Sequence, residues 1–143
     1  MEEFKLKNWL LRIDRGRTRE ILKHIKSDGE NCSCLYCKNY IASRDKIFSK
    51  EFLSLMKELG IDHKKDIHTS HIVEIEEGFH LYEIDYYFAG ELVFEPPVNK
   101  VINTDYFAYH ISSNLNYRRN EFPLPALVLE CYIKIPWVLE EKL

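Results

Sequence analysis

The chain has 143 residues, of which 45% are hydrophobic and 13% aromatic, with five glycines and five prolines. This composition is too apolar for a disordered segment and predicts one domain, residues 1–143, around one core. The 20 Lys and Arg are outnumbered by 23 Asp and Glu, so the formal net charge is −3. A chain without excess positive charge does not attract polyanions, and we therefore do not expect nucleic acid as its main partner.

The beginning of the chain, residues 1–7, alternates charged and apolar side chains. Signal peptides and membrane spans need an uninterrupted apolar stretch, so we expect a cytoplasmic protein that does not associate with membranes. Thiols are kept reduced in the cytoplasm, and four cysteines are too few for a disulfide scaffold in a chain of this length. We therefore expect cysteines that bind metal, take part in redox chemistry or are inert.

Apolar residues first recur at helical spacing, up to about residue 60. Thr18 is the expected N-cap of one helix, because its hydroxyl can accept a hydrogen bond from a free amide. Ser49 is the expected N-cap of another, and Gly60 is its expected end, because glycine readily adopts the left-handed conformation.

From about residue 70 the apolar residues alternate instead, which is typical of strands. A turn at 76–78 is expected to join the first two strands, Gly90 to interrupt the pattern, and Pro96 and Pro97 to end it, since proline cannot donate to a ladder. The expected strands cover 72–75, 82–88, 92–94, 106–112 and 127–135.

These patterns predict an α+β fold. The helices are expected in the N-terminal part, about residues 1–62, packed on an antiparallel meandering sheet within about residues 70–139. The sheet is expected to have about four or five strands, a common size for a small domain.

Three of the four cysteines, Cys32, Cys34 and Cys37, stand within six residues. We expect a helix with its N-cap at Ser33, which would place Cys34, Cys37 and Ile41 on one face. Our working interpretation is that Cys34 and Cys37 face the core as small apolar residues, that Cys32 lies in the turn, and that none of the three is reactive. Asn39 and Tyr40 would then fasten this helix to its neighbour.

Two chemical interpretations of the cysteines stay open. A tetrahedral zinc ion needs a fourth ligand besides the three sulfurs, and the candidates are His63, His68 and His71, or the distant Cys131, which alternates inward on an apolar strand and is better explained as a core residue. Alternatively, Cys34 and Cys37 could carry out thiol-disulfide exchange, because a helix N-terminus stabilises a thiolate. A helix and a polar turn precede the pair, however, whereas thioredoxin-type proteins place it after a strand.

Other residues carry weaker signals. No phosphate-binding loop, nucleophile elbow or dinucleotide fingerprint occurs, so we do not expect a known class of enzyme. Carboxylates crowd the region 74–91, but alternation puts most of them on a solvated face and singles out no pair for acid–base chemistry. Aromatic residues exceed what one core needs, and the expected interaction surface comprises Tyr87, Tyr106 and His110.

Two segments are distinctive, Cys34–Tyr40 and Pro136–Leu139. They resemble a family of small, uncharacterised bacterial proteins with a Cys-x-x-Cys-x-Asn-aromatic segment and a C-terminal Pro-Trp-Val-Leu. Residues 52–62 and 86–91 also resemble that family, although His63 stands where the family has a proline. The resemblance implies an intact fold and brings no activity or ligand.

The expected function is therefore that of a small cytoplasmic bacterial protein that binds another macromolecule without catalysis and without a cofactor. Inhibition of another bacterial protein by binding to it would fit this expectation. The chain could also associate with a second copy of itself. The alternative is a cysteine-cluster protein that binds structural zinc or performs thiol-disulfide exchange.

Overall fold

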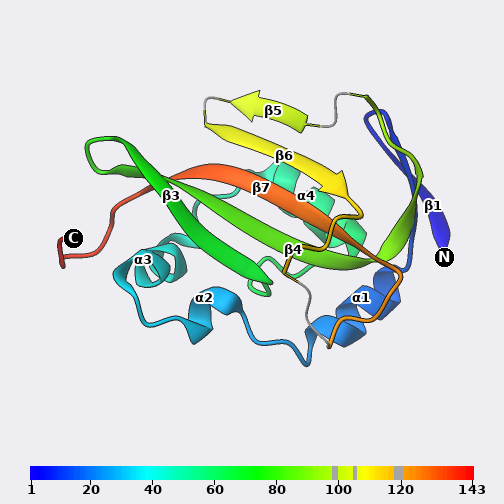
Figure 1. The fold of residues 1–143 in the computed structure, drawn as a ribbon, viewed down its shortest axis with the longest axis horizontal. Coiled ribbons are helices and arrows are strands. Elements are labelled where there is room, and N and C mark those ends of the chain that lie inside the picture. Colours follow the sequence, from blue (N-terminus) through cyan, green and yellow to red (C-terminus); the bar gives the residue numbers. More distant parts are fainter. Residues whose placement is uncertain (98–99, 105, 118–120) are drawn as a thin grey trace.

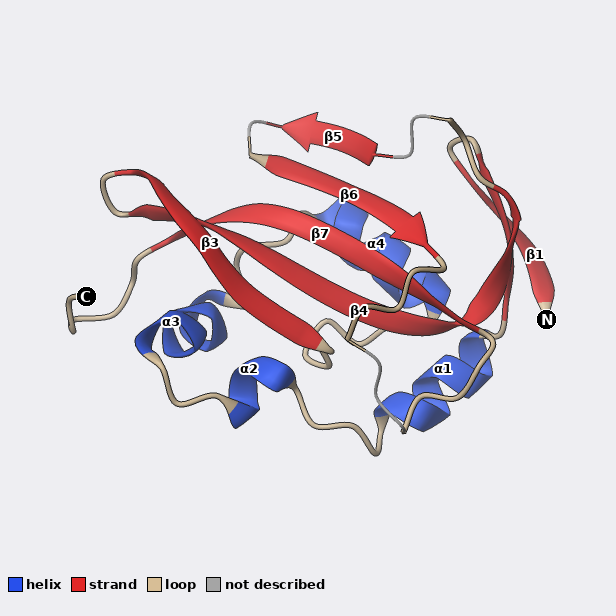
Figure 2. Ribbon diagram, in the orientation of Figure 1, coloured by secondary structure: helices blue, strands red, loops and turns tan. Residues whose placement is uncertain are grey.

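The computed structural model describes residues 1–97, 100–104, 106–117 and 121–143. It has an α+β fold in which helices pack on an antiparallel sheet, as the sequence predicts (Figure 1; Figure 2). The elements in chain order are β1 (Glu2–Leu6), β2 (Trp9–Ile13), α1 (Arg15–Leu22), α2 (Asp28–Asn31), α3 (Leu35–Ser43), α4 (Lys50–Leu59), β3 (His68–Glu76), β4 (Phe79–Phe94), β5 (Lys100–Thr104), β6 (Phe107–Ser112) and β7 (Ala126–Pro136).

The described strands form a seven-stranded sheet in the order β1-β2-β4-β7-β6-β5, with β3 paired to β4 beside this path. The long strand β4 is central: residues 79–89 pair with β7, residues 79–85 also pair with β3, and residues 90–94 pair with β2. In Figure 1 helix α4 lies behind the sheet, while α1, α2 and α3 follow its lower side and the two termini lie at opposite ends of the view.

The sheet differs from the expected one in three ways. It has more than four or five strands, it is not a simple meander because β7 lies next to β4, and its first two strands precede all the helices. The short hairpin β1–β2 turns at Lys7, whose φ of 52° is left-handed. Gly90 does not interrupt β4, which continues to Phe94. A Cβ at this position would lie only 2.6 Å from the carbonyl oxygen of Arg12, so glycine allows β2 to approach closely.

Helix α4 is confirmed with both of its predicted ends, whereas α1 begins earlier than predicted. The Ser49 hydroxyl accepts from the amide of Phe52, and Gly60 adopts a φ of 85°. The N-cap of α1 is Asp14, not Thr18. Thr18 lies inside the helix, where its buried hydroxyl accepts a hydrogen bond from the Ala89 amide of β4 and so ties the helix to the sheet.

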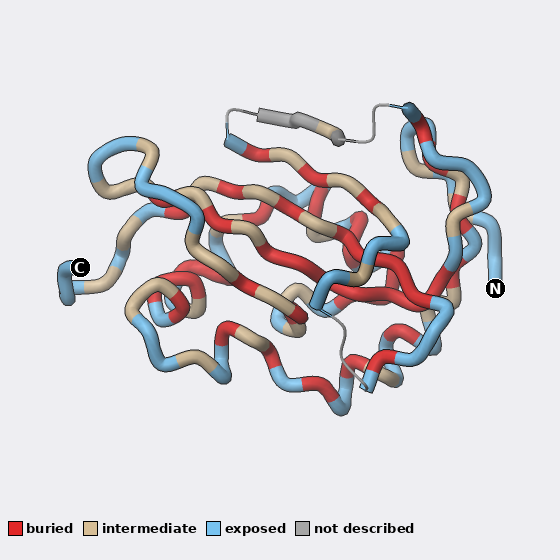
Figure 3. The backbone as a smooth tube through the Cα atoms, in the orientation of Figure 1, coloured by how far each residue is buried: buried red, intermediate tan, exposed pale blue. Residues whose placement is uncertain are grey.

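Buried apolar residues form two clusters, one on each face of the sheet. Figure 3 shows that buried positions run along the central strands. The larger cluster fills the space between one face and helices α3 and α4, and includes Tyr40, Phe52 and Tyr86. The smaller cluster lies on the opposite face and includes Ile25, Tyr87 and Phe122. The neighbours of Tyr87 in sequence, Tyr86 and Phe88, face the larger cluster, so Tyr87 faces the smaller one. Tyr87 is buried there and does not belong to an exposed interaction surface. Among the residues described, no helix is long and apolar enough to cross a membrane.

Candidate functional site

The three clustered cysteines surround the start of α3. Cys32 follows α2, Cys34 is the N-cap of α3, and Cys37 lies in its first turn. Their three Sγ atoms lie within 4.8 Å of one another. The shortest separation is 3.1 Å, where the Cys32 thiol donates to the Sγ of Cys34. The local fold therefore brings together the three sulfurs that the sequence singles out.

Cys34, rather than Ser33, is the N-cap, and this explains why it does not face the core. Its Sγ accepts a hydrogen bond from the Cys37 amide at 3.4 Å, as an N-cap side chain does. An N-cap side chain turns back toward the free amides, so Cys34 is exposed, while Cys37 is buried and Cys32 is half-buried. The working interpretation is wrong for Cys34, which does not pack against the core beside Ile41.

The environment separates the acidities of the two cysteines in α3. Burial opposes ionisation of Cys34, but hydrogen bonds from the Cys37 amide and from the thiols of Cys32 and Cys37 together lower its pKa. Burial, followed by its thiol contacts with Cys32 and Cys34, raises the pKa of Cys37 well above the ordinary range. Without a metal the cluster therefore favours one thiolate, at Cys34, stabilised by neighbouring donors.

A buried carboxylate fixes the two helices that carry the cysteines. Asp66 accepts hydrogen bonds from the Ser27 hydroxyl, the Gly29 amide and the Tyr40 hydroxyl, and so joins α2 to α3. The helices also approach closely at Gly29, where a Cβ would lie 2.8 Å from the Tyr40 ring. Cys32 is the C-cap of α2 and Cys34 is the N-cap of α3. The positions of their sulfur atoms therefore depend on the contacts of Asp66 and Gly29 that hold the two helices together.

Asn39 holds α3 against the end of β7, as expected for a fastening residue. Its amide nitrogen donates to the carbonyl oxygen of Pro136 at 3.0 Å, and its carbonyl oxygen accepts from the amide of Val138 at 2.8 Å. The Tyr36 ring also meets the Trp137 ring edge to face, with centroids 6.1 Å apart. The two segments that are distinctive in the sequence, Cys34–Tyr40 and Pro136–Leu139, therefore contact each other.

None of the candidate fourth ligands joins the sulfur cluster within the described part of the chain. His63 contacts Asp45 at 2.8 Å, and the His68 ring stacks on Tyr117. His71 contacts His80 at 2.8 Å and stacks on Tyr36. Cys131 is fully buried on β7 in the larger core cluster, in agreement with its interpretation as a core residue.

The cluster has the size that a thiolate metal site requires. Zinc–sulfur bonds of about 2.3 Å in tetrahedral geometry place sulfur atoms about 3.8 Å apart. The three Sγ atoms lie within 4.8 Å of each other, so small side-chain rotations would bring all of them onto one ion. The group is thus positioned to hold a metal ion through three ligands, which leaves a fourth coordination position open.

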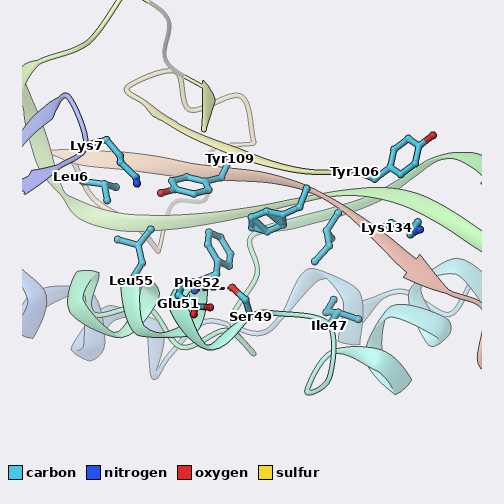
Figure 4. A pocket seen from close by; sticks show the side chains of 12 residues that line it. Leu6, Lys7, Ile47, Ser49, Glu51, Phe52, Leu55, Tyr106, Tyr109 and Lys134 are labelled. Atoms are coloured by element: carbon cyan, nitrogen blue, oxygen red, sulfur yellow. Dashed lines mark hydrogen bonds between the residues drawn. The ribbon is translucent and has the colours of Figure 1, made fainter. Parts of the chain in front are cut away.

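A separate pocket of about 570 Å³ lies between α4 and strands β6 and β7. Figure 4 shows Phe52 and Leu55 pointing from α4 toward the strands, with Tyr106 at one end of the view and Lys7 at the other. Tyr106 is half exposed, and its place in an interaction surface stays a prediction. Lys7 and Tyr106 are the non-glycine residues with positive φ in the described part of the chain, and both line this pocket.

One further cluster was not found from the sequence: Glu83, Asp85 and Glu130 bring their carboxylate oxygens within 4.8 Å of one another. Asp85 and Glu130 face each other in the pairing of β4 with β7. His110, expected on an exposed surface, is largely buried beside this cluster, 3.3 Å from Glu130. Alternation along β4 marks Glu83 and Asp85 as neighbours on one face, but only the strand order brings Glu130 to them.

Comparison of the chain with protein-family models, with curated proteins and with solved structures found no match.

Proposed function

We propose that the chain is a metal-binding protein in which Cys32, Cys34 and Cys37 hold a zinc ion as three thiolates. The observation that supports this proposal is the convergence of the third sulfur, Cys32, on the other two. Zinc is the expected metal because it favours thiolate ligands and tetrahedral geometry. Water occupies the fourth position in this proposal, so the ion is accessible to an incoming ligand, as in zinc sites with three protein ligands.

Thiol-disulfide exchange is the competing function of the same residues. An exposed Cys34 with a lowered pKa and a buried Cys37 would suit attack by the first sulfur and resolution by the second. That chemistry uses only Cys34 and Cys37 as reacting sulfurs, however, and leaves Cys32 only as a hydrogen-bond donor to the Cys34 thiolate. Metal binding uses all three sulfurs, and for this reason we prefer it.

The direct test is the zinc content of reduced protein, measured by elemental analysis together with competition against a chromophoric chelator. We expect one zinc per chain in the wild-type protein and loss of tight binding in Cys32→Ser, because the hydroxyl is a poor zinc ligand. Cys131→Ala is the matched control, since it removes the one cysteine outside the cluster and should leave the zinc content unchanged. A wild-type protein without stoichiometric metal would contradict the proposal.

The same variant separates the two functions of the cysteines. In thiol-disulfide exchange, Cys32→Ser should retain the reactivity of Cys34 toward a small disulfide, because Cys34 and Cys37 are intact. In zinc binding, added zinc should protect Cys34 of the wild-type protein from that reagent and should not protect it in Cys32→Ser. Equal protection in both proteins would count against a three-thiolate site.

A second candidate function is the binding of a partner protein at the pocket between α4 and the sheet, which would continue the expectation from the sequence. The half-exposed Tyr106 and the left-handed backbone at Lys7 and Tyr106 support it, because strained residues gather at binding sites. Co-purification from the native host should recover a partner with the wild-type chain and lose it with Tyr106→Glu. Leu124→Glu, which changes another exposed apolar residue, should retain that partner.

A further inference from the structure

The carboxylates of Glu83, Asp85 and Glu130 meet on the sheet face that looks away from α3 and α4. Alternation along β4 sends Tyr82 and Ile84 into the larger core cluster, so Glu83 and Asp85 project from the other face. Cross-strand register then places Glu130 of β7 directly opposite Asp85. The cluster is thus built by the two central strands and not by a loop.

Asp85 is buried without a partner for one of its oxygens. The residue is only 2% exposed, and its Oδ1 has no hydrogen-bond partner in the described structure. Tyr117, whose ring stacks on His68 of β3, belongs to the segment that crosses this face, and its amide donates to the hydroxyl of Tyr87. The Asp85 carboxylate is therefore shielded from water by the protein.

The described contacts of Glu130 in this cluster come from a histidine and a tyrosine. Glu130 lies 3.3 Å from the Nε2 of His110 and accepts a hydrogen bond from the Tyr132 hydroxyl. Among the side chains of residues 1–97, 101, 106–117 and 121–143, no lysine or arginine forms an ion pair with any of the three carboxylates. Like charges at this separation in a shielded place repel strongly, and a shared proton or a bound cation would relieve this repulsion.

We propose that Glu83, Asp85 and Glu130 form a binding site for a hard divalent cation of the class of Ca²⁺, Mg²⁺ and Mn²⁺. Such cations take oxygen ligands at about 2.0–2.6 Å, which places the ligand oxygens at most about 5 Å apart. The oxygens of the three carboxylates lie within 4.8 Å of one another and meet this requirement. The bound cation provides the partner that Asp85 Oδ1 lacks.

The site is independent of the proposed zinc site in its chemistry and in its place on the fold. Three thiolates favour a soft or borderline ion, whereas three carboxylates favour a hard one. The cysteines surround the start of α3, and the carboxylates project from strands β4 and β7 on the other face of the sheet. Either site can therefore be lost while the other remains.

Terbium luminescence provides a direct probe, because Tb³⁺ occupies hard oxygen sites and emits when a nearby tyrosine is excited. The Tyr132 hydroxyl contacts Glu130, so an ion at the cluster lies within a few ångströms of a phenol ring. We expect sensitised emission on titrating Tb³⁺ into the full-length chain, and a decrease on adding Ca²⁺ or Mn²⁺. The same titration in Cys32→Ser should be unchanged, which separates this proposal from the zinc proposal.

Asp85→Asn tests the assignment of the ligands, since it removes the charge and keeps the size of the side chain. We expect its affinity for Tb³⁺ to fall at least tenfold. Glu91→Gln is the matched control, because Glu91 is an exposed carboxylate of the same strand paired with Arg12 at 3.7 Å, and it should bind Tb³⁺ as the wild-type chain does. Glu130→Gln replaces Asp85→Asn as the test variant if the latter does not fold.

Two results would overturn the proposal. Equal Tb³⁺ affinity in the wild-type chain and in a folded Asp85→Asn or Glu130→Gln variant would place the ion elsewhere. Absence of sensitised emission in the wild-type chain, together with no rise in its melting temperature on adding Mn²⁺ or Ca²⁺, would show that the carboxylates share protons and hold no cation.

Discussion

At the scale of single residues, the side chain with the largest structural role is one that the sequence does not single out. Asp66 is fully buried and accepts hydrogen bonds from two hydroxyls of the α2–α3 unit, one backbone amide, and the Thr69 hydroxyl at 2.6 Å. Arg44 approaches the same carboxylate to 4.0 Å. A buried carboxylate with this many donors organises its surroundings, because every donor would otherwise lack a partner.

Replacing Asp66 with alanine should therefore lower the free energy of unfolding by about 3–5 kcal/mol, since several buried donors lose their acceptor. Urea denaturation followed by circular dichroism measures this change. Asp62→Ala is the control, because Asp62 is exposed and accepts only from the amide of Lys64 in this structure, so the loss there should stay below about 1 kcal/mol. Similar losses in the two variants would contradict the structural role of Asp66.

The sequence identifies the cysteine cluster at residue level but not its geometry. Ser33 and Cys34 can both cap a helix, and only the packed helix shows that the sulfur of Cys34 does so. The carboxylate cluster could not be predicted because Asp85 and Glu130 are brought together by the pairing of distant strands. Nothing local distinguishes Asp85 from Glu83 and Glu91, the other carboxylates of the same strand.

At the scale of elements, the end of α4 is the best-defined junction. Gly60 has a φ of 85°, and a Cβ there would lie 2.5 Å from the carbonyl oxygen of Arg15 in α1. Both the left-handed conformation and the contact with backbone exclude a side chain. Gly60 therefore ends α4 and at the same time lets α1 pack against it.

We expect Gly60→Ala to lower the free energy of unfolding by more than about 2 kcal/mol, because it adds a steric clash to the conformational penalty of about 1–2 kcal/mol. Gly78→Ala separates the two contributions. Gly78 has a similar φ of 79° but open space around a Cβ, so only the conformational penalty applies. Chemical denaturation of both variants measures the difference, and equal losses would show that the contact with Arg15 has no energetic weight.

Helices and strands with clear sequence patterns of their own could be predicted. Those whose form depends on a neighbouring strand could not. Helix α4 has an N-cap hydroxyl, an apolar stripe and a terminal glycine, and each was recognised. The five-residue strands of the β1–β2 hairpin are too short to show a clear period. Gly90 was expected to interrupt a strand, whereas it is needed for the close approach of β2.

At the scale of the whole molecule, the buried carboxyl group of Asp85 links stability to pH. Burial, followed by the nearby Glu83 and Glu130, raises the pKa of Asp85 to about 9. In the unfolded chain the pKa of an aspartate is about 3.9. Between these two values the folded protein binds a proton that the unfolded chain has lost, so the free energy of unfolding decreases as the pH rises from about 4 to about 9.

Asp85→Asn should remove this contribution, because the amide does not titrate. As the pH rises, the free energy of unfolding of the wild-type chain should fall relative to that of Asp85→Asn, by up to about 1.4 kcal/mol per pH unit. Urea denaturation at pH 5, 7 and 9 with a chelator present measures the difference without cations. A difference that does not change with pH would show that Asp85 is ionised throughout.

The α+β class follows from the change in apolar period near residue 70, but the strand order does not follow from the sequence. Antiparallel strands pair through backbone groups that every residue carries, so a pattern of alternation shows that a strand exists and not which strand lies beside it. The position of β7 between β4 and β6 could be recognised only from the assembled sheet.

The pairing of β2 with the far end of β4 has a consequence for the nascent chain. Ile13 meets Gly90, so roughly 80 residues must leave the ribosome after the first hairpin before its sheet partner exists. At a synthesis rate of about 5–20 residues per second this delay is roughly 4–16 seconds. A two-stranded hairpin is at best marginally stable alone, so the β1–β2 hairpin forms late although it is made before the other strands of its sheet.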